Sequence, residues 1–437
     1  MEAQQIDLLI HNIGNLVTMR GEPAPRAGER MAEIGLVKGG AVAIADGRVF
    51  AVGAEDEVLQ QIGRLPVTQR IDAQGRLVTP GLIDPHTHLV HGGSREHELA
   101  LKLQGVSYLE ILAQGGGILS TVRATRQASE AELYEKARKS LNVMLLHGAT
   151  TVEAKSGYGL TLEDELKQLR VAKRLNDTHP VDVVSTFMGA HAVPAEYKGQ
   201  SADYVELLIG TMLPEVKRQG LAEFCDVFCE HWVFTVDESR RILTAAKELG
   251  FGLKIHADEI EPLGGAQLAA ELGCISAEHL LAATDEGLRA MRQAGVIAVC
   301  LPATSFNLRL QQHARARDMI RLGLPVALST DYNPGSSPTE SLQLVMTLAC
   351  LNLGMTPEEV ITALTINAAC AIGRQDTIGS LEPGKQADLV IFDAPNLAYL
   401  PYHFGINHVD TVLKKGRVVV EQGQLVKPTE SEPFPGS

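Results

Sequence analysis

The sequence lacks the surplus of positive charge that a nucleic-acid-binding protein normally shows as a basic stripe. Its 437 residues contain 39 lysines and arginines against 53 aspartates and glutamates, which gives a net charge of -14. We therefore expect no nucleic-acid partner. The negative charge does not exclude an anionic small molecule, because a single arginine in a pocket can bind a carboxylate locally.

A long apolar segment is also missing. No stretch approaches the roughly 20 consecutive apolar residues that a membrane-spanning helix needs. The first residues, MEAQQ, show no basic region that leads into an apolar run. We therefore expect no membrane association, no secretory signal and a cytoplasmic location.

Cysteine is scarce, with six residues in the chain, and most of them lie in apolar runs. This distribution is typical of reduced, buried thiols rather than of a disulfide framework. Cys225 and Cys229 could be taken for a pair of metal-binding thiolates, but their spacing in the strand-like run 223–229 places both on one face of a sheet. We expect them to pack in the core.

Short strands rich in branched residues, separated by glycine and aspartate turns, occur at both ends of the chain. They cover residues 6–13, 40–53, 69–79, 387–393 and 408–426. We expect the two ends to meet in a small composite β-sandwich domain. Its parts would be residues 1–79 and 376–437, with a separate central domain at 80–375.

The central part repeats an apolar strand, a polar turn and an amphipathic helix, which is the pattern of parallel βα units. The strands are expected to end near His88, Lys155, Met188, Cys229, His256, His279, Leu301 and Asp331. Eight such units predict an α/β fold of the (β/α)8 TIM-barrel type. The loop 89–129, with its glycines at 115–117, is long for a connector, so a closing or substrate-contacting role stands beside an ordinary turn.

Residues able to bind a metal stand at several of these strand ends. His86 and His88 are two positions apart, and on a strand two such side chains point to the same side. His256 ends the fifth strand and Asp331 ends the eighth. Barrels of this type carry their active sites at this end, so the four donors could bind one divalent ion and leave a position for water. Zinc, iron(II) and manganese all suit such donors.

Five segments are similar to those of a known family: GVSYLEILAQGGGI, KSGYGL, GAHAVP, HADE with the following LGGA, and STDYNPGSSPTESL. On these segments the chain resembles the amidohydrolase superfamily and, within it, the imidazolonepropionase family, over essentially its whole length. The resemblance implies hydrolysis of the cyclic amide of 4-imidazolone-5-propanoate to N-formimidoyl-L-glutamate. It also implies a homodimer and one divalent ion per subunit, zinc or iron(II).

The resemblance further implies a role for individual residues. The metal ligands would be His86, His88, His256 and Asp331. Glu259 would exchange a proton with the ring nitrogen, and His279 or Asp331 would take the proton of the attacking water. The substrate would be bound by Arg95, Tyr158, His191, Glu259, Asn333, Gly335 and Ser336, with Arg95 and Tyr158 on its carboxylate.

One further observation and one departure from the family pattern bear on this assignment. Binuclear relatives carry a carbamylated lysine at the end of the fourth strand, whereas this chain reads Phe-Cys-Glu-His at 228–231, so we expect a single metal. The family usually has an aspartate directly before the arginine, but here Ser94 precedes Arg95, which leaves the orientation of Arg95 open.

Two alternatives remain. The first is a deaminase of a purine, pyrimidine or related heterocycle, which would use the same barrel and metal and release ammonia. Arg95, Tyr158 and the KSGYGL segment favour an anionic substrate over a neutral base. The second is a non-catalytic scaffold protein, which we would expect to have lost some of its metal ligands.

Overall fold

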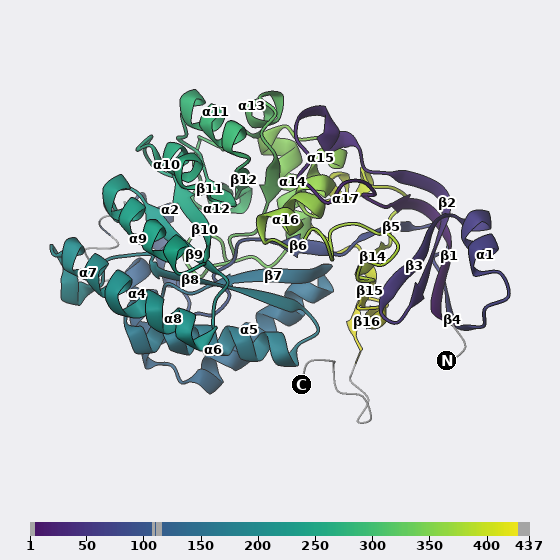
Figure 1. Ribbon diagram of the computed structural model, residues 1–437, viewed down its shortest axis with the longest axis horizontal. Helices are drawn as coiled ribbons and strands as arrows, with labels where there is room; N and C mark the ends of the chain where they lie inside the picture. The colour runs from purple at the N-terminus through teal and green to yellow at the C-terminus, as the bar shows by residue number, and fades with distance from the viewer. Residues whose placement is uncertain (1–4, 107–109, 111–115, 427–437) are drawn as a thin grey trace.

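The structure is a computed structural model that describes residues 5–106, 110 and 116–426. It consists of a strand-and-helix barrel and, beside it, a twisted sheet formed by the two ends of the chain (Figure 1). Among the described residues, no helix combines the length and apolar composition needed to cross a bilayer. The central part of the segment 105–118, including Gly115, lies outside the described residues.

The barrel strands of the described chain are all parallel and are hydrogen-bonded in sequence order. They are β6 (Leu82–Asp84), β7 (Ala149–Lys155), β8 (Asp182–Ala190), β9 (Phe224–Cys229), β10 (Gly252–Ala257), β11 (Ser276–His279), β12 (Ile297–Cys300) and β13 (Val326–Leu328). A parallel bridge between Thr87 and Tyr332 brings the first and last strands together and nearly closes the barrel. The predicted fold class is confirmed.

Helices cover the outside of this barrel (Figure 1). They are α2 (His97–Leu103), α4 (Ile118–Gln127), α5 (Glu130–Leu146), α6 (Leu162–Thr178), α7 (Ser201–Leu207), the π-helix η3 (Leu208–Met212), α8 (Leu213–Gln219), α9 (Val236–Glu248), α10 (Gly265–Leu272), α11 (Asp285–Ala294), α12 (Pro302–Asn307), α13 (Ala316–Arg321), α14 (Leu342–Leu353), α15 (Pro357–Ala363) and α16 (Ile366–Ala371). Short 3-10 turns lie at Gly28–Ala32 (η1) and Ala195–Tyr197 (η2). Capping boxes begin α5 at Ser129, α9 at Thr235 and α15 at Thr356.

The second sheet unites both ends of the chain. Its strands are β1 (Ile6–Val17), β2 (Leu36–Ala45), β3 (Arg48–Ala54), β4 (Val67–Asp72), β5 (Leu77–Pro80), β14 (Leu389–Phe392), β15 (Val409–Lys414), β16 (Arg417–Glu421) and β17 (Gln424–Leu425), with the helices α1 (Glu55–Ile62) and α17 (Tyr399–Tyr402) in its connections. Strand β5 joins the halves, because it pairs with β1 on one side and with β14 on the other. Leu8, Val78 and Leu389 share one apolar cluster, so residues nearly 400 positions apart form one core. The boundaries at 79/80 and 375/376 stay predictions.

The structure corrects one local prediction. Strand β6 ends at Asp84, so His86 and His88 follow the strand rather than lie on it. Pro85 has no amide hydrogen to donate, which ends the ladder at that point. The long segment 89–129 contains the helices α2 and α4, in line with the expectation that it is more than a plain connector. Its closing or substrate-contacting role stays a prediction.

Candidate functional site

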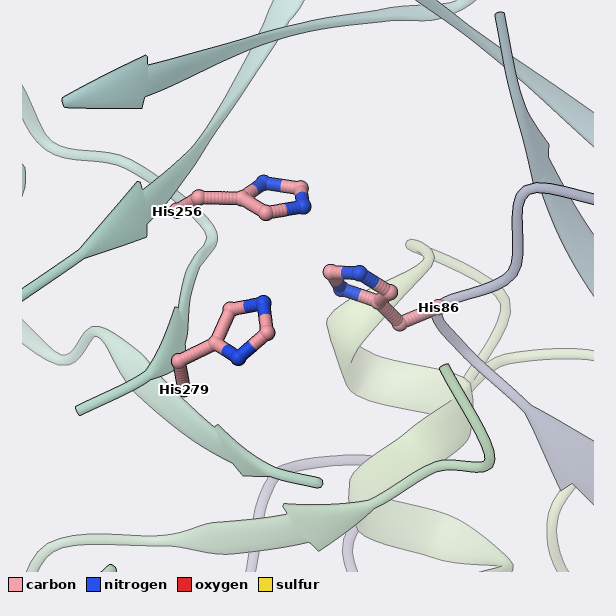
Figure 2. Close-up of side chains that lie close together, drawn as sticks. All are labelled: His86, His256 and His279. Carbon is pink, nitrogen blue, oxygen red and sulfur yellow. The ribbon is translucent and has the colours of Figure 1, made fainter. Parts of the chain in front are cut away.

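Three imidazoles converge at the carboxyl end of the barrel. His86, His256 and His279 point toward one another from different strand ends (Figure 2), and each offers a ring nitrogen within 4.8 Å of the other two. His86 also belongs to a second group, with His88 and Asp331, whose donor atoms lie within 4.8 Å of one another. All five side chains are buried. The structure therefore brings together the four predicted ligands and His279.

Two of these rings are held by carboxylates on the side that faces away from the centre. Nδ1 of His86 lies 2.9 Å from Oε2 of Glu278, and Nδ1 of His256 lies 3.1 Å from Oδ1 of Asp226. A carboxylate accepts a hydrogen bond, so Nδ1 carries the hydrogen and Nε2 presents a lone pair. Both Nε2 atoms are buried and have no hydrogen-bond partner among the described residues. Orphaned nitrogens of this kind fit a metal centre.

Asp331 completes the donor set. Its Oδ1 lies 3.4 Å from Nε2 of His86 and 3.6 Å from Nε2 of His88, while Oδ2 accepts a hydrogen bond of 2.6 Å from Thr304. Burial raises the pKa of this carboxyl group to about 7. Three imidazoles and one carboxylate are donors that suit zinc, iron(II) or manganese.

The backbone at the rim is strained at residues of this site. Asp258, His279 and Asp331 have φ angles of 48°, 70° and 53°, which place them in the left-handed region that residues with a side chain rarely adopt. Such conformations cost on the order of 1 kcal/mol or more each and are found mainly where a functional geometry requires them. The strain identifies the ends of β10, β11 and β13 as a functional rim.

Glu259 and His279 form a proton-handling pair beside the donors. Oε1 of Glu259 lies 3.5 Å from Nδ1 of His279. Burial and the nearby carboxylate of Asp331 raise the pKa of Glu259 to about 8, so it carries a proton at neutral pH. Burial lowers the pKa of His279 well below its usual value, so its ring is neutral. The pair therefore offers a proton donor next to a proton acceptor.

Asp258, the neighbour of Glu259, points elsewhere. Its carboxylate accepts hydrogen bonds from the backbone amides of Gly264, Gly265 and Ala266 at the start of α10. An acidic side chain is favoured at a helix N-terminus. Of the two carboxylates in the HADE segment, one therefore shapes the loop and the other faces the site.

The orientation of Arg95, which the sequence left open, is fixed by Glu98. The Nε and Nη2 atoms of Arg95 donate to the two carboxylate oxygens of Glu98 at 3.0 and 2.8 Å. This two-pronged pairing leaves Nη1 toward Gly335, where an added Cβ would meet it at 2.0 Å. Lys102 donates to the carbonyl oxygen of Gly335 at 2.8 Å, so two cations gather at this corner.

His191 and Tyr158 form an aromatic wall beside His88. The His191 ring stacks on that of His88 with centroids 4.6 Å apart, and the Tyr158 ring lies 5.6 Å from His88 and 5.1 Å from His191. Nδ1 of His191 lies 3.1 Å from the carbonyl oxygen of Gly157. A side chain at Gly157 would collide with His191, so the glycine of KSGYGL is needed for this approach.

Asn333 organises the loop that follows β13. Its Oδ1 accepts from the amides of Gly335 and Ser336, both at 2.8 Å, and its Nδ2 donates to the carbonyl oxygen of Asp331 at 2.7 Å. Ser336 is tied into the same loop through its hydroxyl group. The side chain of Asn333 is thus engaged with its own loop, and the substrate contacts expected of Asn333, Gly335 and Ser336 stay predictions.

Sequence reasoning missed four residues of the site: Asp226, Glu278, Glu98 and Thr304. The signal for the first two was present, because each is a carboxylate inside a barrel strand. Buried acids of that kind need a partner. Glu98 lies three positions after its partner Arg95, a spacing that could have signalled an ion pair. Thr304 gave no comparable signal, since its partner Asp331 lies 27 positions away.

Known proteins are similar to this chain in sequence and in fold. A model of the amidohydrolase family matches residues 77–419. The imidazolonepropionase of Alkaliphilus metalliredigens (strain QYMF) is 59% identical over 423 residues, which cover 96% of this chain and 100% of that protein. The imidazolonepropionase of Geobacillus kaustophilus (strain HTA426) is 58% identical over 420 residues, which cover 96% and 99%.

Solved structures share the architecture at low sequence identity. A 5-methylcytosine deaminase from Klebsiella pneumoniae, liganded with 5-fluorocytosine, superposes with a TM-score of 0.71 at 17% identity and covers 98% of this chain and 100% of its own. An adenosine deaminase from Xanthomonas campestris with bound zinc gives 0.69 at 19% identity, covering 98% and 95%. At these identities the likeness supports the barrel and the attached sheet alone.

Proposed function

The chain belongs to the amidohydrolase family and, within it, to the imidazolonepropionases, and from this premise we propose the reaction and the part that each residue takes. The protein is a hydrolase acting on carbon–nitrogen bonds. It adds water to 4-imidazolone-5-propanoate and opens the ring to give N-formimidoyl-L-glutamate. The observation that carries this conclusion is the 59% identity to an imidazolonepropionase over 96% of this chain, together with the buried donors and the arginine corner, formed by Arg95 and Lys102, at one end of the barrel.

We propose one divalent ion per subunit, held by His86, His88, His256 and Asp331. Zinc is our first candidate, and iron(II) is the second. Such an ion supplies a Lewis acid and lowers the pKa of water. The orphaned Nε2 atoms of His86 and His256 support this assignment, since an imidazole pinned through Nδ1 is the usual form of a metal-binding histidine.

The carboxylate of the substrate would bind at the arginine corner. Arg95 has its Nε and Nη2 atoms engaged by Glu98, which leaves Nη1 to meet an oxygen of the propanoate, and Tyr158 would act with it. His191 would flank the ring, and the loop of Asn333, Gly335 and Ser336 would border the formimidoyl end. This division separates recognition at one edge of the site from chemistry at the other.

Proton transfer would be divided between two residues. His279, neutral because burial lowers its pKa, accepts the proton of the attacking water at a ring nitrogen. Asp331 is the alternative acceptor. Glu259, protonated because its pKa is raised to about 8, donates to the ring nitrogen as the carbon–nitrogen bond breaks. Water thus adds across the amide bond, with oxygen on carbon and hydrogen on nitrogen.

The test is direct hydrolysis of the proposed substrate. Purified protein incubated with freshly generated 4-imidazolone-5-propanoate should remove its ultraviolet absorbance, and a chelator-treated sample should not. No ammonia should appear, because ring opening keeps both nitrogens in the product. Ammonia release would support the deaminase alternative, and inert substrate with metal-loaded protein would contradict the proposal. Light scattering would test the homodimer that we infer from the family, and cell fractionation would test the cytoplasmic location that we infer from the sequence.

A further inference from the structure

A chain of alternating charges lies inside the barrel beneath the candidate metal ligands. Lys155 on β7 donates to Oδ2 of Asp226 at 2.7 Å and contacts Glu153 at 3.0 Å. Lys254 on β10 lies 2.8 Å from Glu153 and 3.8 Å from Glu278. All five side chains are completely buried. Each end of the chain is a carboxylate that holds a histidine.

The two ends meet different candidate ligands. Asp226 uses Oδ2 for Lys155 and Oδ1 for Nδ1 of His256, while Glu278 receives Nδ1 of His86. Further bonds fix the carboxylates in place, since the hydroxyl of Ser276 donates to Glu278 at 2.5 Å and that of Thr186 donates to Glu153. An unbroken line of contacts therefore joins the back of one imidazole to the back of the other.

Charged side chains are an energetically unfavourable filling for the inside of a barrel. The inside of such barrels is usually packed with branched apolar side chains. Burying an ion costs several kcal/mol even after relaxation, and apolar side chains of similar volume often stabilise a protein as well or better. The charges therefore point to a requirement other than stability, namely that the carboxylates at both ends stay in one orientation.

We propose that the chain Asp226–Lys155–Glu153–Lys254–Glu278 is a positioning device that aims Nε2 of His256 and His86 at one divalent ion. The proposal rests on the metal site of the proposed function. Lys155 touches none of the candidate ligands, so it acts through Asp226. If Lys155 lost its ammonium group, the carboxylate of Asp226 would be free to rotate. The His256 ring would then no longer be held in one orientation with Nε2 toward the site.

The test compares two buried lysines. Lys155→Met removes the ammonium group beneath the site. Lys414→Met is the matched control, because Lys414 is also buried and pairs at 2.7 Å with Asp388 and with Asp182. It lies on β15 of the terminal sheet and meets Asp182 at the amino end of β8, the end of the barrel opposite the candidate site. Zinc affinity is measured by competition with a chromogenic chelator, and folding by circular dichroism. We expect Lys155→Met to weaken zinc binding roughly 10- to 100-fold, the usual effect of losing a residue that orients a ligand, and Lys414→Met to change it less than twofold.

A second comparison covers the case in which Lys155→Met does not fold. The double variant Lys155→Met/Asp226→Asn removes both charges of the pair. It should bind zinc as weakly as Asp226→Asn alone, because Lys155 acts through Asp226. Zinc binding by the double variant that is weaker than binding by Asp226→Asn alone, or wild-type zinc affinity in folded Lys155→Met, would overturn the positioning role. Failure of the unaltered protein to bind zinc, iron(II) or manganese would instead overturn the metal site itself.

Discussion

The interiors of the two sheets differ in composition. The terminal sheet packs Leu8, Val78 and Leu389 into an apolar cluster, whereas the barrel near its carboxyl end encloses Glu153, Lys155, Asp226, Lys254 and Glu278. The apolar cluster gains free energy from removing carbon surface from water. In the charged interior, burying the ions costs desolvation free energy, and the ion pairs hold the side chains in fixed orientations. Because the barrel also has a large apolar core between its strands and helices, the charged interior is set apart from the apolar clusters that stabilise the molecule.

The largest expected effect is a loss of turnover without a loss of metal binding in the barrel. Glu259→Gln keeps the shape of the side chain but cannot deliver the proton, so kcat should fall by roughly 10²- to 10⁴-fold. Metal content, measured by plasma mass spectrometry, should be unchanged. The control is Glu261→Gln, two residues further on at an exposed position. Full activity in Glu259→Gln would remove this residue from the mechanism.

The next prediction tests the terminal sheet alone. Leu389→Ala leaves a cavity in the cluster that joins the two ends of the chain, so the free energy of unfolding should fall by about 2–5 kcal/mol. Chemical denaturation gives this value. Zinc affinity and kcat of the folded variant should stay near those of the unaltered protein. A large loss of zinc affinity would mean that the two regions are not separate in the way described.

A smaller effect is expected at the substrate-binding edge of the barrel. Glu98→Gln loses a charge-assisted contact to Arg95, so the guanidinium group is held less firmly. A loss of about 1.4 kcal/mol would raise KM roughly tenfold, with kcat little changed. Steady-state kinetics measures both. Glu96→Gln, an exposed position on the same turn, is the matched control. Equal kinetics in the two variants would contradict the role of Glu98.

The smallest effect, a fall of about twofold in kcat at pH 8, concerns pH. The raised pKa of Glu259, about 8, means that the group is protonated below this pH and loses its proton above it. Because the protonated form is the donor, kcat should be level near neutral pH and decline above pH 8, by about tenfold per unit once the group is mostly ionised. A pH profile of kcat gives the midpoint. A rate that keeps rising to pH 9.5 would show that Glu259 does not act as an acid.

Much of the site could be predicted because strand ends in a parallel barrel meet at one rim. The sequence placed His86, His88, His256, His279 and Asp331 at such ends, and the structure gathers all of them. The barrel and the composite sheet followed from the order of strands and helices. The repeat of apolar strand and amphipathic helix carries that information locally.

The partners of these residues could not be predicted in the same way. The bond between Asp226 and Lys155 depends on which side chains of β7 and β9, more than 70 positions apart, face the same point inside the barrel. The grip of Glu98 on Arg95 depends on the start of α2, where the family pattern had suggested the preceding residue instead. The first contact depends on how separate strands pack around the barrel, which a linear pattern does not specify. The second joins residues three positions apart and was within reach of the sequence.

The most direct test of the central claim is anomalous diffraction from crystals grown with zinc. The account predicts one strong peak per chain, about 2.0–2.2 Å from nitrogens of His86, His88 and His256 and from an oxygen of Asp331, with Nδ1 of His86 and His256 still on Glu278 and Asp226. A peak that lacks His256 or Asp331 among its ligands, or two peaks of equal strength in the barrel, would contradict it.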